Sequence, residues 1–324
     1  MLAISSVNHQ LALIEHPIPQ PAAGQLLIKV AAAGVNRADL MQAQGKYPPP
    51  KGESEILGLE VAGIIVALGE NVIDWQVGDA VLALVAGGAY AEYCLVEQSL
   101  CCLQPNTLSS SEAASLPEVW LTAWLNLIDI GQLKAGQRVL IHAGASGVGA
   151  AAIQLAKSVG AWVAVTTSTS EKQAFCRELG ADLVIDYRAQ DFATEIKTAG
   201  GVDLILDTVG GDYLAGNQRC LNADGLIIVI GLLRGIEAQL NLGLMLVKRQ
   251  RIQGSALRSQ SLAIKAQLTK ALRNEILPRI ASGEFKITLD RTFPIQEAES
   301  AHQYLAANRN LGKVVLVLDE TKES

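Results

Sequence analysis

Residues 138–161 read RVLIHAGASGVGAAAIQLAKSVGA. Val139–Ile141 form a short apolar run typical of a buried strand, and residues 150–156 continue as a helix with little side-chain bulk in its first turn. A loop of small residues, from Ala143 to Gly149, lies between them. A strand, a tight turn and a helix N-terminus in this order predict a dinucleotide site, because the free N–H groups at the helix end attract a pyrophosphate.

The loop departs from the G-x-G-x-x-G fingerprint at one position. Gly144 and Gly149 hold the first and third glycine positions, but Ser146 holds the second, with Gly147 beside it. A loop of this kind taken alone is also compatible with a glycine-rich turn that binds no ligand. We predict that the loop binds a cofactor through Gly144, Ser146, Gly147, Val148 and Gly149.

From Arg138 onward, short apolar runs alternate with helical segments. Runs that are apolar on both faces predict a parallel sheet covered on both sides, which is a doubly wound α/β arrangement. The expected strands are Val139–Ile141, Trp162–Val165, Leu183–Ile185, Leu204–Leu206 and Leu226–Ile230. The expected helices cover residues 148–159, 170–179, 191–199 and 212–221.

The two ends of the chain have a different texture. The first ~115 residues are rich in Gly, Pro and short alternating apolar runs, which predicts mainly β structure. A helix is expected to begin near Ser109. The tail predicts a long amphipathic segment over Ser261–Ile280, a helix near Glu297–Ala307 and a final strand over residues 312–317. We expect this tail to rejoin the N-terminal part.

Composition excludes several classes of protein. Half of the 324 residues are hydrophobic and 18% are charged, which allows a large core and favours two domains. The net charge of −6 argues against bulk binding of nucleic acid. No apolar run approaches the ~20 residues that span a bilayer. With no signal-peptide pattern after Met1 and five cysteines that form no C-x-x-C pair, we expect a cytoplasmic protein without disulfides.

The second strand indicates which dinucleotide is bound. In a site for NAD, an Asp or Glu about 20 residues past the glycines binds the ribose 2′-OH. Here the strand ends in hydroxyl residues such as Ser168, with Lys172 nearby, and both favour a 2′-phosphate. Tyr187 is expected near the adenine or the phosphate. A solvated Lys172 and ordinary packing of Tyr187 remain alternatives, and Glu171 lies close by. We predict NADPH.

Two further segments extend the pattern beyond the loop. With GVNRADLMQAQGKYPPP (34–50) and ILGLEVAGIIVALG (56–69), the chain resembles the medium-chain dehydrogenase/reductase superfamily. It is most similar to the zinc-independent quinone oxidoreductases, in the branch of the tumour-suppressor-inducible quinone oxidoreductase. The resemblance covers nearly the whole chain. It implies a GroES-like β domain, residues 1–116 and 260–324, with a Rossmann domain, residues 117–259, inserted, and an active site where the two meet.

The resemblance also bears on metal binding. Zinc-dependent relatives place a Cys where this chain has Asn36 and a His where it has Leu59. Their third ligand falls near Glu118, and Glu60 is the only other nearby candidate. Zinc needs three or four N, S or O ligands, and Leu offers none. We therefore predict that the protein binds no metal.

Without a metal, hydrogen-bond donors must stabilise the negative charge that grows on a substrate oxygen during hydride transfer. The resemblance implies Asn36 and Tyr47 as these donors. The structural alternatives are turn chemistry after Gly34 for Asn36 and packing on the triple proline for Tyr47.

Three further residues are implied near the nicotinamide, namely Thr122, Gly231 and Leu232. A helix-interior role for Thr122 and a plain strand-to-loop turn at Gly231 are the alternatives. Relatives commonly form homodimers through edge strands of the Rossmann sheet, so we expect a homodimer, with the strand before Gly231 or residues 252–254 at its interface.

Together these features predict an NADPH-dependent quinone oxidoreductase. A quinone suits the small number of polar candidates, because the hydroquinone anion is a fairly stable product. One alternative is NADPH-dependent reduction of an activated C=C bond in an enone or enoyl thioester. A second is a binding or structural protein that retains NADPH. The basic run Lys248–Arg251 fits a solvated turn better than a nucleic-acid site.

Overall fold

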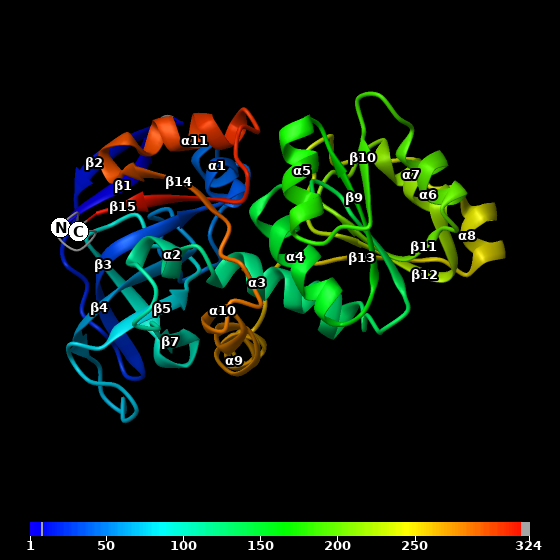
Figure 1. Ribbon diagram of the computed structural model, residues 1–324. Coiled ribbons are helices and arrows are strands. Elements are labelled where there is room, and N and C mark those ends of the chain that lie inside the picture. Colours follow the sequence, from blue (N-terminus) through cyan, green and yellow to red (C-terminus); the bar gives the residue numbers. More distant parts are fainter. Residues whose placement is uncertain (8, 319–324) are drawn as a thin grey trace. The chain divides into compact units, whose positions relative to one another are not determined.

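The chain forms two units (Figure 1). A computed structural model describes residues 1–7 and 9–318. Unit 1 comprises Met1–Leu121 and Arg258–Ser324, and unit 2 comprises Thr122–Leu257. The tail therefore belongs to the same unit as the N-terminal part.

Unit 2 is built on a six-stranded parallel sheet with the strand order β10-β9-β8-β11-β12-β13. The chain moves outward from β8 to β10 and then returns to the other side of β8. This is the order of a Rossmann fold, in which the reversal leaves a crevice at the carboxyl ends of the two central strands. The strands are β8 (Arg138–Ile141), β9 (Trp162–Thr167), β10 (Leu183–Asp186), β11 (Val202–Asp207), β12 (Leu221–Val229) and β13 (Arg251–Gly254).

Helices cover both faces of this sheet. Figure 1 shows α4 and α5 on one face and α6 and α7 on the other. Because both faces are covered, the central residues Leu140, Ile205 and Ile227 are fully buried. The helices are α4 (Gly147–Ser158), α5 (Ser170–Glu178), α6 (Phe192–Thr198), α7 (Tyr213–Cys220) and α8 (Leu242–Lys248). The doubly wound α/β prediction is confirmed, and each predicted strand and helix lies within a few residues of its observed position.

Unit 1 contains a seven-stranded sheet with the order β14-β15-β3-β4-β5-β7, in which β6 also pairs with β3. The last strand in the described residues, β15, pairs antiparallel with β3, so that Val314 lies opposite Val35. A separate hairpin joins β1 (Leu2–Val7) to β2 (Gln10–Glu15). The sheet strands are β3 (Gln25–Val35), β4 (Glu60–Leu68), β5 (Ala80–Leu84), β6 (Tyr93–Glu97), β7 (Cys101–Leu103), β14 (Leu289–Pro294) and β15 (Lys313–Val317).

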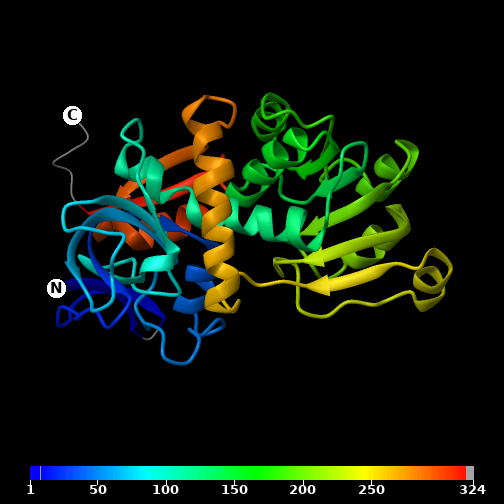
Figure 2. The same ribbon diagram turned by 90° about the horizontal axis from the view of Figure 1, so that it is seen from below.

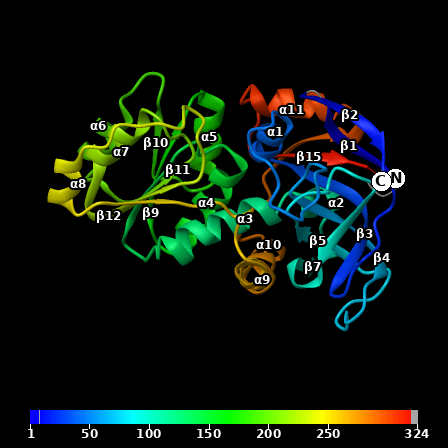
Figure 3. The ribbon, with the colours of Figure 1, turned by 180° about the vertical axis from the view of Figure 1, so that it is seen from behind.

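Helices of unit 1 come from both parts of the sequence. Helix α9, a π-helical turn and α10 follow one another as a single column (Figure 2), as the predicted amphipathic segment requires. Helix α11 lies beside α1, seen from behind in Figure 3. The α-helices are α1 (Arg37–Ala43), α2 (Ser110–Ala114), α9 (Leu262–Ala271), α10 (Leu277–Ala281) and α11 (Ala298–Ala306). The π turn is η3 (Leu272–Ile276), and 3-10 turns are η1 (Gln98–Leu100) and η4 (Ile295–Glu297).

Helix α3 (Pro117–Trp124) and the following π-helical turn η2 (Leu125–Ile130) carry the chain from unit 1 into unit 2. The predicted N-cap at Ser109 is present, because its hydroxyl accepts a hydrogen bond from the backbone N–H of Glu112. Within the described part of the chain, no helix has the length and apolar character needed to cross a membrane.

Candidate active site

Asn36 lies where β3 ends and α1 begins. Its backbone is extended, with φ −126° and ψ 155°, and it occupies the N-cap position of the helix. Its backbone N–H donates to Asp39 Oδ2 at 2.7 Å. An Asn followed three residues later by an acidic residue is a favourable start for a helix, because both groups satisfy free backbone donors. Local sequence therefore explains the position of Asn36 but not the orientation of its side chain.

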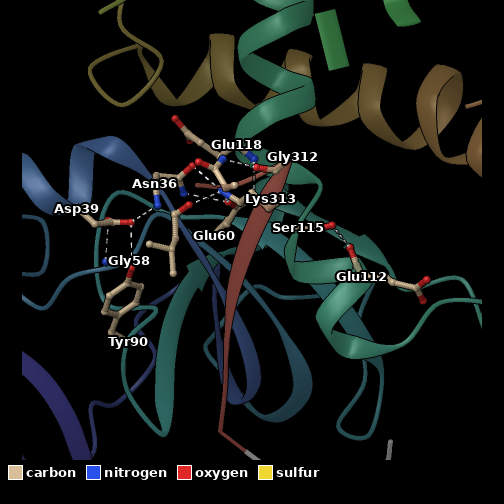
Figure 4. Close-up of polar contacts among 12 residues, drawn as sticks. Asn36, Asp39, Gly58, Glu60, Tyr90, Glu112, Ser115, Glu118, Gly312 and Lys313 are labelled. Carbon is tan, nitrogen blue, oxygen red and sulfur yellow. Dashed lines mark hydrogen bonds and ion pairs between the residues drawn. The ribbon is translucent and has the colours of Figure 1, made fainter. Parts of the chain in front are cut away.

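A buried ion pair between Lys313 and Glu60 sets that orientation (Figure 4). The two side chains are only 3% and 0% exposed. Lys313 Nζ also donates to the carbonyl oxygen of Val35 at 3.0 Å and to Asn36 Oδ1 at 2.6 Å. Lys313 reaches this position because β15, which it opens, pairs with β3.

The amide of Asn36 is held at both of its ends. Its Oδ1 accepts from the ammonium of Lys313, and its Nδ2 donates to Glu60 Oε1 at 2.9 Å. Reversing the amide would place oxygen against a carboxylate and nitrogen against an ammonium. An amide nitrogen carries two hydrogens. One hydrogen of Asn36 Nδ2 therefore remains for a further acceptor, in a direction that the ion pair sets.

Glu118 joins the same cluster from the first turn of α3. Its backbone N–H donates to Glu60 Oε2 at 2.9 Å. Burial, together with the negative charge of Glu60, raises the pKa of the Glu118 carboxyl to about 8. Glu118 is therefore mostly protonated at neutral pH, so a neutral carboxylic acid lies within electrostatic reach of Glu60 and Lys313.

Asp39 connects the start of α1 to the interior of unit 1 (Figure 4). It is fully buried, and its carboxylate accepts hydrogen bonds from Gly58 N at 3.2 Å and from the hydroxyl of Tyr90 at 3.2 Å. The same Tyr90 hydroxyl lies 3.2 Å from His302 Nε2 on α11. Burial raises the pKa of Asp39 to about 6 although these donors favour its charged form. This network anchors the helix that Asn36 begins.

Tyr47, the second predicted donor, lies in the same unit. Burial and the nearby Glu118 raise the pKa of its hydroxyl, so the hydroxyl keeps its proton at neutral pH. The guanidinium carbon of Arg258 lies 5.3 Å from the centroid of the Tyr47 ring. The sequence pattern pointed to no role for Lys313 or Arg258, and it marked Glu60 and Glu118 only as candidate metal ligands. The only sequence signal for Lys313 is the segment 310–313 (NLGK), which matches the family that the chain resembles.

In unit 2, the small-residue loop lies where a Rossmann fold binds a dinucleotide. It follows the carboxyl end of β8 and leads into α4, beside the point where the strand order reverses. Ser146 is the N-cap of α4, and its hydroxyl accepts from the backbone N–H of Gly149 at 3.0 Å. The serine at the second glycine position thus caps the helix.

The two outer glycines of the loop are required by packing. A Cβ on Gly144 would lie 2.7 Å from Cβ of Val165 on β9. A Cβ on Gly149 would lie 2.5 Å from the carbonyl oxygen of Ala143. These contacts bring the helix start close to the sheet. A turn that binds no ligand could have the same contacts. The interpretation of the loop as a cofactor site therefore depends on its position, beside the point where the strand order reverses.

A buried hydrogen-bond network lies next to the glycine loop and includes His142, the residue that precedes it. His142 Nε2 lies 2.8 Å from Asn217 Oδ1, and Asn217 Nδ2 donates to Asp207 at 2.9 Å. His142 Nδ1 lies 3.0 Å from the Thr166 hydroxyl. Because Asn217 turns its oxygen toward the imidazole, Nε2 carries the proton and Nδ1 accepts from Thr166. Burial lowers the pKa of His142 and keeps it neutral, in agreement with its expected structural role.

The remaining predicted cofactor residues follow the strands next to the loop. Ser168 comes directly after β9, and Tyr187 directly after β10 with 39% of its surface exposed. Lys172 lies in the first turn of α5, where its backbone N–H donates to the hydroxyl of Thr169. Carboxyl ends of parallel strands share one edge of the sheet, so Ser168 and Tyr187 lie on the same side as the loop. Their contacts with a cofactor remain predictions.

The three residues expected near the nicotinamide have separate structural surroundings. Gly231 follows β12, and a Cβ there would lie 2.6 Å from the carbonyl oxygen of Thr208. Leu232 is 44% exposed. Thr122 is 8% exposed, and its carbonyl accepts from Asn126 Nδ2 at 2.8 Å. The turn at Gly231 therefore has a packing reason of its own, and a role toward nicotinamide remains a prediction for all three.

We predict that Lys313→Met lowers the free energy of unfolding by about 3–5 kcal/mol, because it leaves the carboxylate of Glu60 buried without its cation. Glu60→Gln combined with Lys313→Met removes that charge and should recover a substantial part of the loss. Denaturant unfolding of the two variants and of the Glu60→Gln single variant measures the coupling. Additive effects of the two substitutions would contradict the pairing.

Models of known families match both parts of the chain. Residues 22–107 match the alcohol dehydrogenase GroES-like domain, and residues 179–316 match a family described as zinc-binding dehydrogenase. In the described residues of this chain, no group of three or more His, Cys, Asp or Glu side chains is placed to hold a metal ion.

Solved structures of similar fold include two complexes with NADPH. Escherichia coli quinone oxidoreductase complexed with NADPH has a TM-score of 0.90 and 28% identity, over 98% of this chain and 100% of that one. Mycobacterial Rv1454c complexed with NADPH has a TM-score of 0.89 and 31% identity over the same shares. The CurK enoyl reductase has a TM-score of 0.86 and 31% identity, over 98% of this chain and 99% of that one.

Curated relatives differ in how much of their length the chain spans. The rat synaptic vesicle membrane protein VAT-1 homolog is 31% identical, over 94% of this chain and 80% of its own length. A phenolphthiocerol/phthiocerol polyketide synthase of Mycobacterium tuberculosis is 31% identical over 93% of this chain, which spans only 14% of that protein. With both domain families and the full-length fold in agreement, the chain belongs to the medium-chain dehydrogenase/reductase superfamily, among its zinc-independent quinone oxidoreductase-like members.

Proposed function

We propose that the protein is an NADPH-dependent oxidoreductase that reduces quinones without a metal ion. The oriented amide of Asn36 carries this proposal. Lys313 and Glu60 hold both ends of the amide and leave one N–H for an acceptor. A donor fixed before the reaction stabilises a developing oxyanion without the cost of reorganising during the step.

In unit 1, two residues act as hydrogen-bond donors to the substrate and two others position one of these donors. When bound, NADPH supplies a hydride, and negative charge then grows on a substrate oxygen. Asn36 donates its free N–H to that oxygen, and Tyr47 donates its hydroxyl, which keeps its proton because its pKa is raised. Lys313 and Glu60 act as positioning residues, since their bonds are made to Asn36. A hydroquinone anion then takes its second proton from water.

We expect Asn36→Ala to lower kcat for 1,4-benzoquinone or 1,2-naphthoquinone by about 10²–10³-fold, the effect of losing one oxyanion donor. Tyr47→Phe should lower it as well. NADPH affinity should be unchanged in both variants, because the substituted residues belong to unit 1 and the glycine loop to unit 2. Steady-state rates and cofactor fluorescence titrations measure the two effects. Full quinone turnover in both variants would refute the assignment.

The choice of NADPH rests on the end of β9. No carboxylate directly follows this strand, since Ser168 is the next residue and Glu171 and Lys172 come later, in the first turn of α5. We infer that Ser168 and Lys172 bind the 2′-phosphate. The two similar structures solved with NADPH support the same cofactor.

NADPH should bind more tightly than NADH in fluorescence titrations of the purified protein. Ser168→Asp introduces a carboxylate that repels the 2′-phosphate and accepts from a 2′-OH, so it should reduce or invert the preference. Thr198→Asp adds the same charge at an exposed position that ends α6, and it should change neither affinity. Equal or tighter binding of NADH by the unsubstituted protein would rule out the proposed preference.

Reduction of an activated C=C bond is the second candidate. In that reaction the hydride adds to one carbon, and the other carbon needs a proton. Glu118, whose pKa is about 8, is an acid available at neutral pH, and its backbone N–H donates to Glu60, the residue that also binds Asn36. Similarity to the CurK enoyl reductase and to a polyketide synthase supports this candidate as well.

An enone and an enoyl-CoA tested beside the quinones separate the two reactions. If Glu118 supplies the proton, kcat/KM for the enone should fall as pH rises through about 8, where the acid form is lost. Glu118→Gln should lower enone reduction far more than quinone reduction. A pH-independent enone rate between pH 6 and 9 would exclude Glu118 as the donor.

Nothing in the described structure favours the alternative of a nucleic-acid-binding protein. The basic run 248–251 has local partners. Lys248 Nζ donates to the carbonyl of Leu221 at 2.6 Å, and Arg249 forms an ion pair with Asp224. Salt-sensitive RNA binding together with inactivity toward quinones and enones would revive this alternative.

We also propose that unit 2 forms a homodimer along β13. This strand is an edge of the parallel sheet, and the segment before it exposes several large apolar side chains. An uncovered strand edge beside an apolar patch is a surface that a second copy covers. The exposed residues are Leu232, Leu233, Ile236, Leu240, Leu242, Leu246 and Val247.

Light scattering should give about twice the chain mass of 34.3 kDa. Leu246→Asp places a charge on a side chain that is 78% exposed next to β13, and it should shift the protein toward monomer. Ile73→Asp serves as the control, since Ile73 is 85% exposed but belongs to unit 1. A monomeric unsubstituted protein, or a dimer insensitive to Leu246→Asp, would contradict this interface.

A further inference from the structure

Arg258 contains a buried hydrogen-bond donor that no described residue satisfies. The residue is only 5% exposed. Its Nε donates to the carbonyl oxygen of Ala86 at 2.7 Å, and its Nη1 donates to the carbonyl oxygen of Tyr47 at 3.4 Å. Its Nη2 is buried and has no hydrogen-bond partner within the described part of the chain. A buried donor left without an acceptor is costly, so this atom points to a ligand.

Hydrogen bonds hold both the backbone and the guanidinium of Arg258. The backbone carbonyl of Arg258 accepts from Nζ of Lys265 on α9 at 3.5 Å. Lys265 is itself buried, with 8% of its surface exposed. The carbonyls of Ala86 and Tyr47 hold the other two nitrogens. Because a guanidinium is planar, fixing Nε and Nη1 also fixes the direction of Nη2.

Arg258 lies beside Tyr47, one of the two predicted donors. Its guanidinium carbon lies 5.3 Å from the Tyr47 ring centroid. Burial lowers the pKa of Arg258, while Tyr47, Asp39 and Glu118 act in the opposite direction. A fixed cation with one free donor therefore stands beside Tyr47.

We propose that Nη2 of Arg258 binds the substrate oxygen on which negative charge accumulates, as a third donor beside Asn36 and Tyr47. The ligand class is an oxygen anion conjugated to a π system, such as a phenolate or an enolate. The inference rests on the proposed reductase function.

Reduction of a quinone generates such an anion. The hydride brings two electrons and one hydrogen to the quinone, the nicotinamide is oxidised, and the quinone becomes a hydroquinone monoanion. Water supplies the remaining proton. The anionic oxygen exists only after hydride transfer begins. A contact with Arg258 therefore stabilises the transition state more than the neutral substrate and should act mainly on kcat.

A binding experiment tests this contact without turnover. The dye 4-nitrophenol, which is yellow only as its phenolate, is titrated into the protein with and without NADP⁺ over a range of pH. The unsubstituted protein should bind the phenolate at least tenfold more tightly than the neutral phenol. In Arg258→Met this ratio should fall toward one, with less than a twofold change for the neutral form. Arg258→Lys, which keeps the charge but loses the planar donor pair, should give an intermediate ratio.

Steady-state kinetics provide the second measurement. Arg258→Met should lower kcat for 1,4-benzoquinone by about 10- to 100-fold with little change in KM. Millimolar guanidinium chloride should restore part of the activity of Arg258→Ala. Arg273→Met is the matched control. Like Arg258, Arg273 donates to a backbone carbonyl, from its Nη2 to that of Cys101 at 2.7 Å, but it lies outside the cluster. It should leave both the dye ratio and kcat unchanged.

Each outcome decides a separate question. If Arg258→Met and Arg258→Lys prefer phenolate as strongly as the unsubstituted protein does, the inference is overturned. Arg258 then only stabilises the backbone at Ala86 and Tyr47. If the preference is lost but the unsubstituted protein reduces no quinone or enone, the oxyanion site stands and the proposed reaction fails. If Arg258→Met does not fold by circular dichroism, Arg258→Lys and the guanidinium rescue decide.

Discussion

The buried ion pair between Lys313 and Glu60 joins three parts of unit 1 that are far apart in sequence. Lys313 opens β15, Glu60 opens β4, and both hold Asn36 at the end of β3. Burying two charges is costly unless their remaining hydrogen-bonding groups are also satisfied. Here Glu60 accepts from Glu118 and Asn36, and Lys313 donates to Val35. The pair is therefore tolerated, and it orients the one amide on which the proposed chemistry depends.

The same pair shapes the protonation of its surroundings. One ammonium cannot balance three nearby carboxyl groups in a low-dielectric interior. Glu60 has the direct contact with Lys313, and the pKa values of Asp39 and Glu118 are raised to about 6 and about 8. The charge of Glu60 therefore favours the neutral form of Glu118, and the ion pair between Lys313 and Glu60 fixes the amide of Asn36 in one orientation. The positive charge beside Asn36 is that of Lys313, and the positive charge beside the Tyr47 ring is that of Arg258.

In unit 2, packing within the protein accounts for the two outer glycines of the glycine loop. Gly144 and Gly149 permit close contact with Val165 and with the loop's own carbonyls, and Ser146 caps α4. The substitution of Ser for Gly at the second position is therefore compatible with the fold, because a hydroxyl can serve a helix N-terminus where no close backbone contact demands glycine. The strand order around β8 then places this loop at the reversal point typical of a dinucleotide site.

The sequence alone determined the alternation of strands and helices in unit 2 and the helix start at Ser109. Apolar periodicity and capping residues act within a few positions of the chain, so local sequence is enough to decide these features. It did not determine the candidate cluster. Lys313 is the first residue of a strand, a position at which many lysines are exposed. It becomes buried only because β15 pairs with β3, which brings it to Asn36, 277 residues away in the sequence. The free donor of Arg258 is likewise invisible in sequence, since it depends on which carbonyls the other two nitrogens find. Local pattern decided the elements; long-range pairing decided which polar groups meet, how they are oriented and which keep their protons.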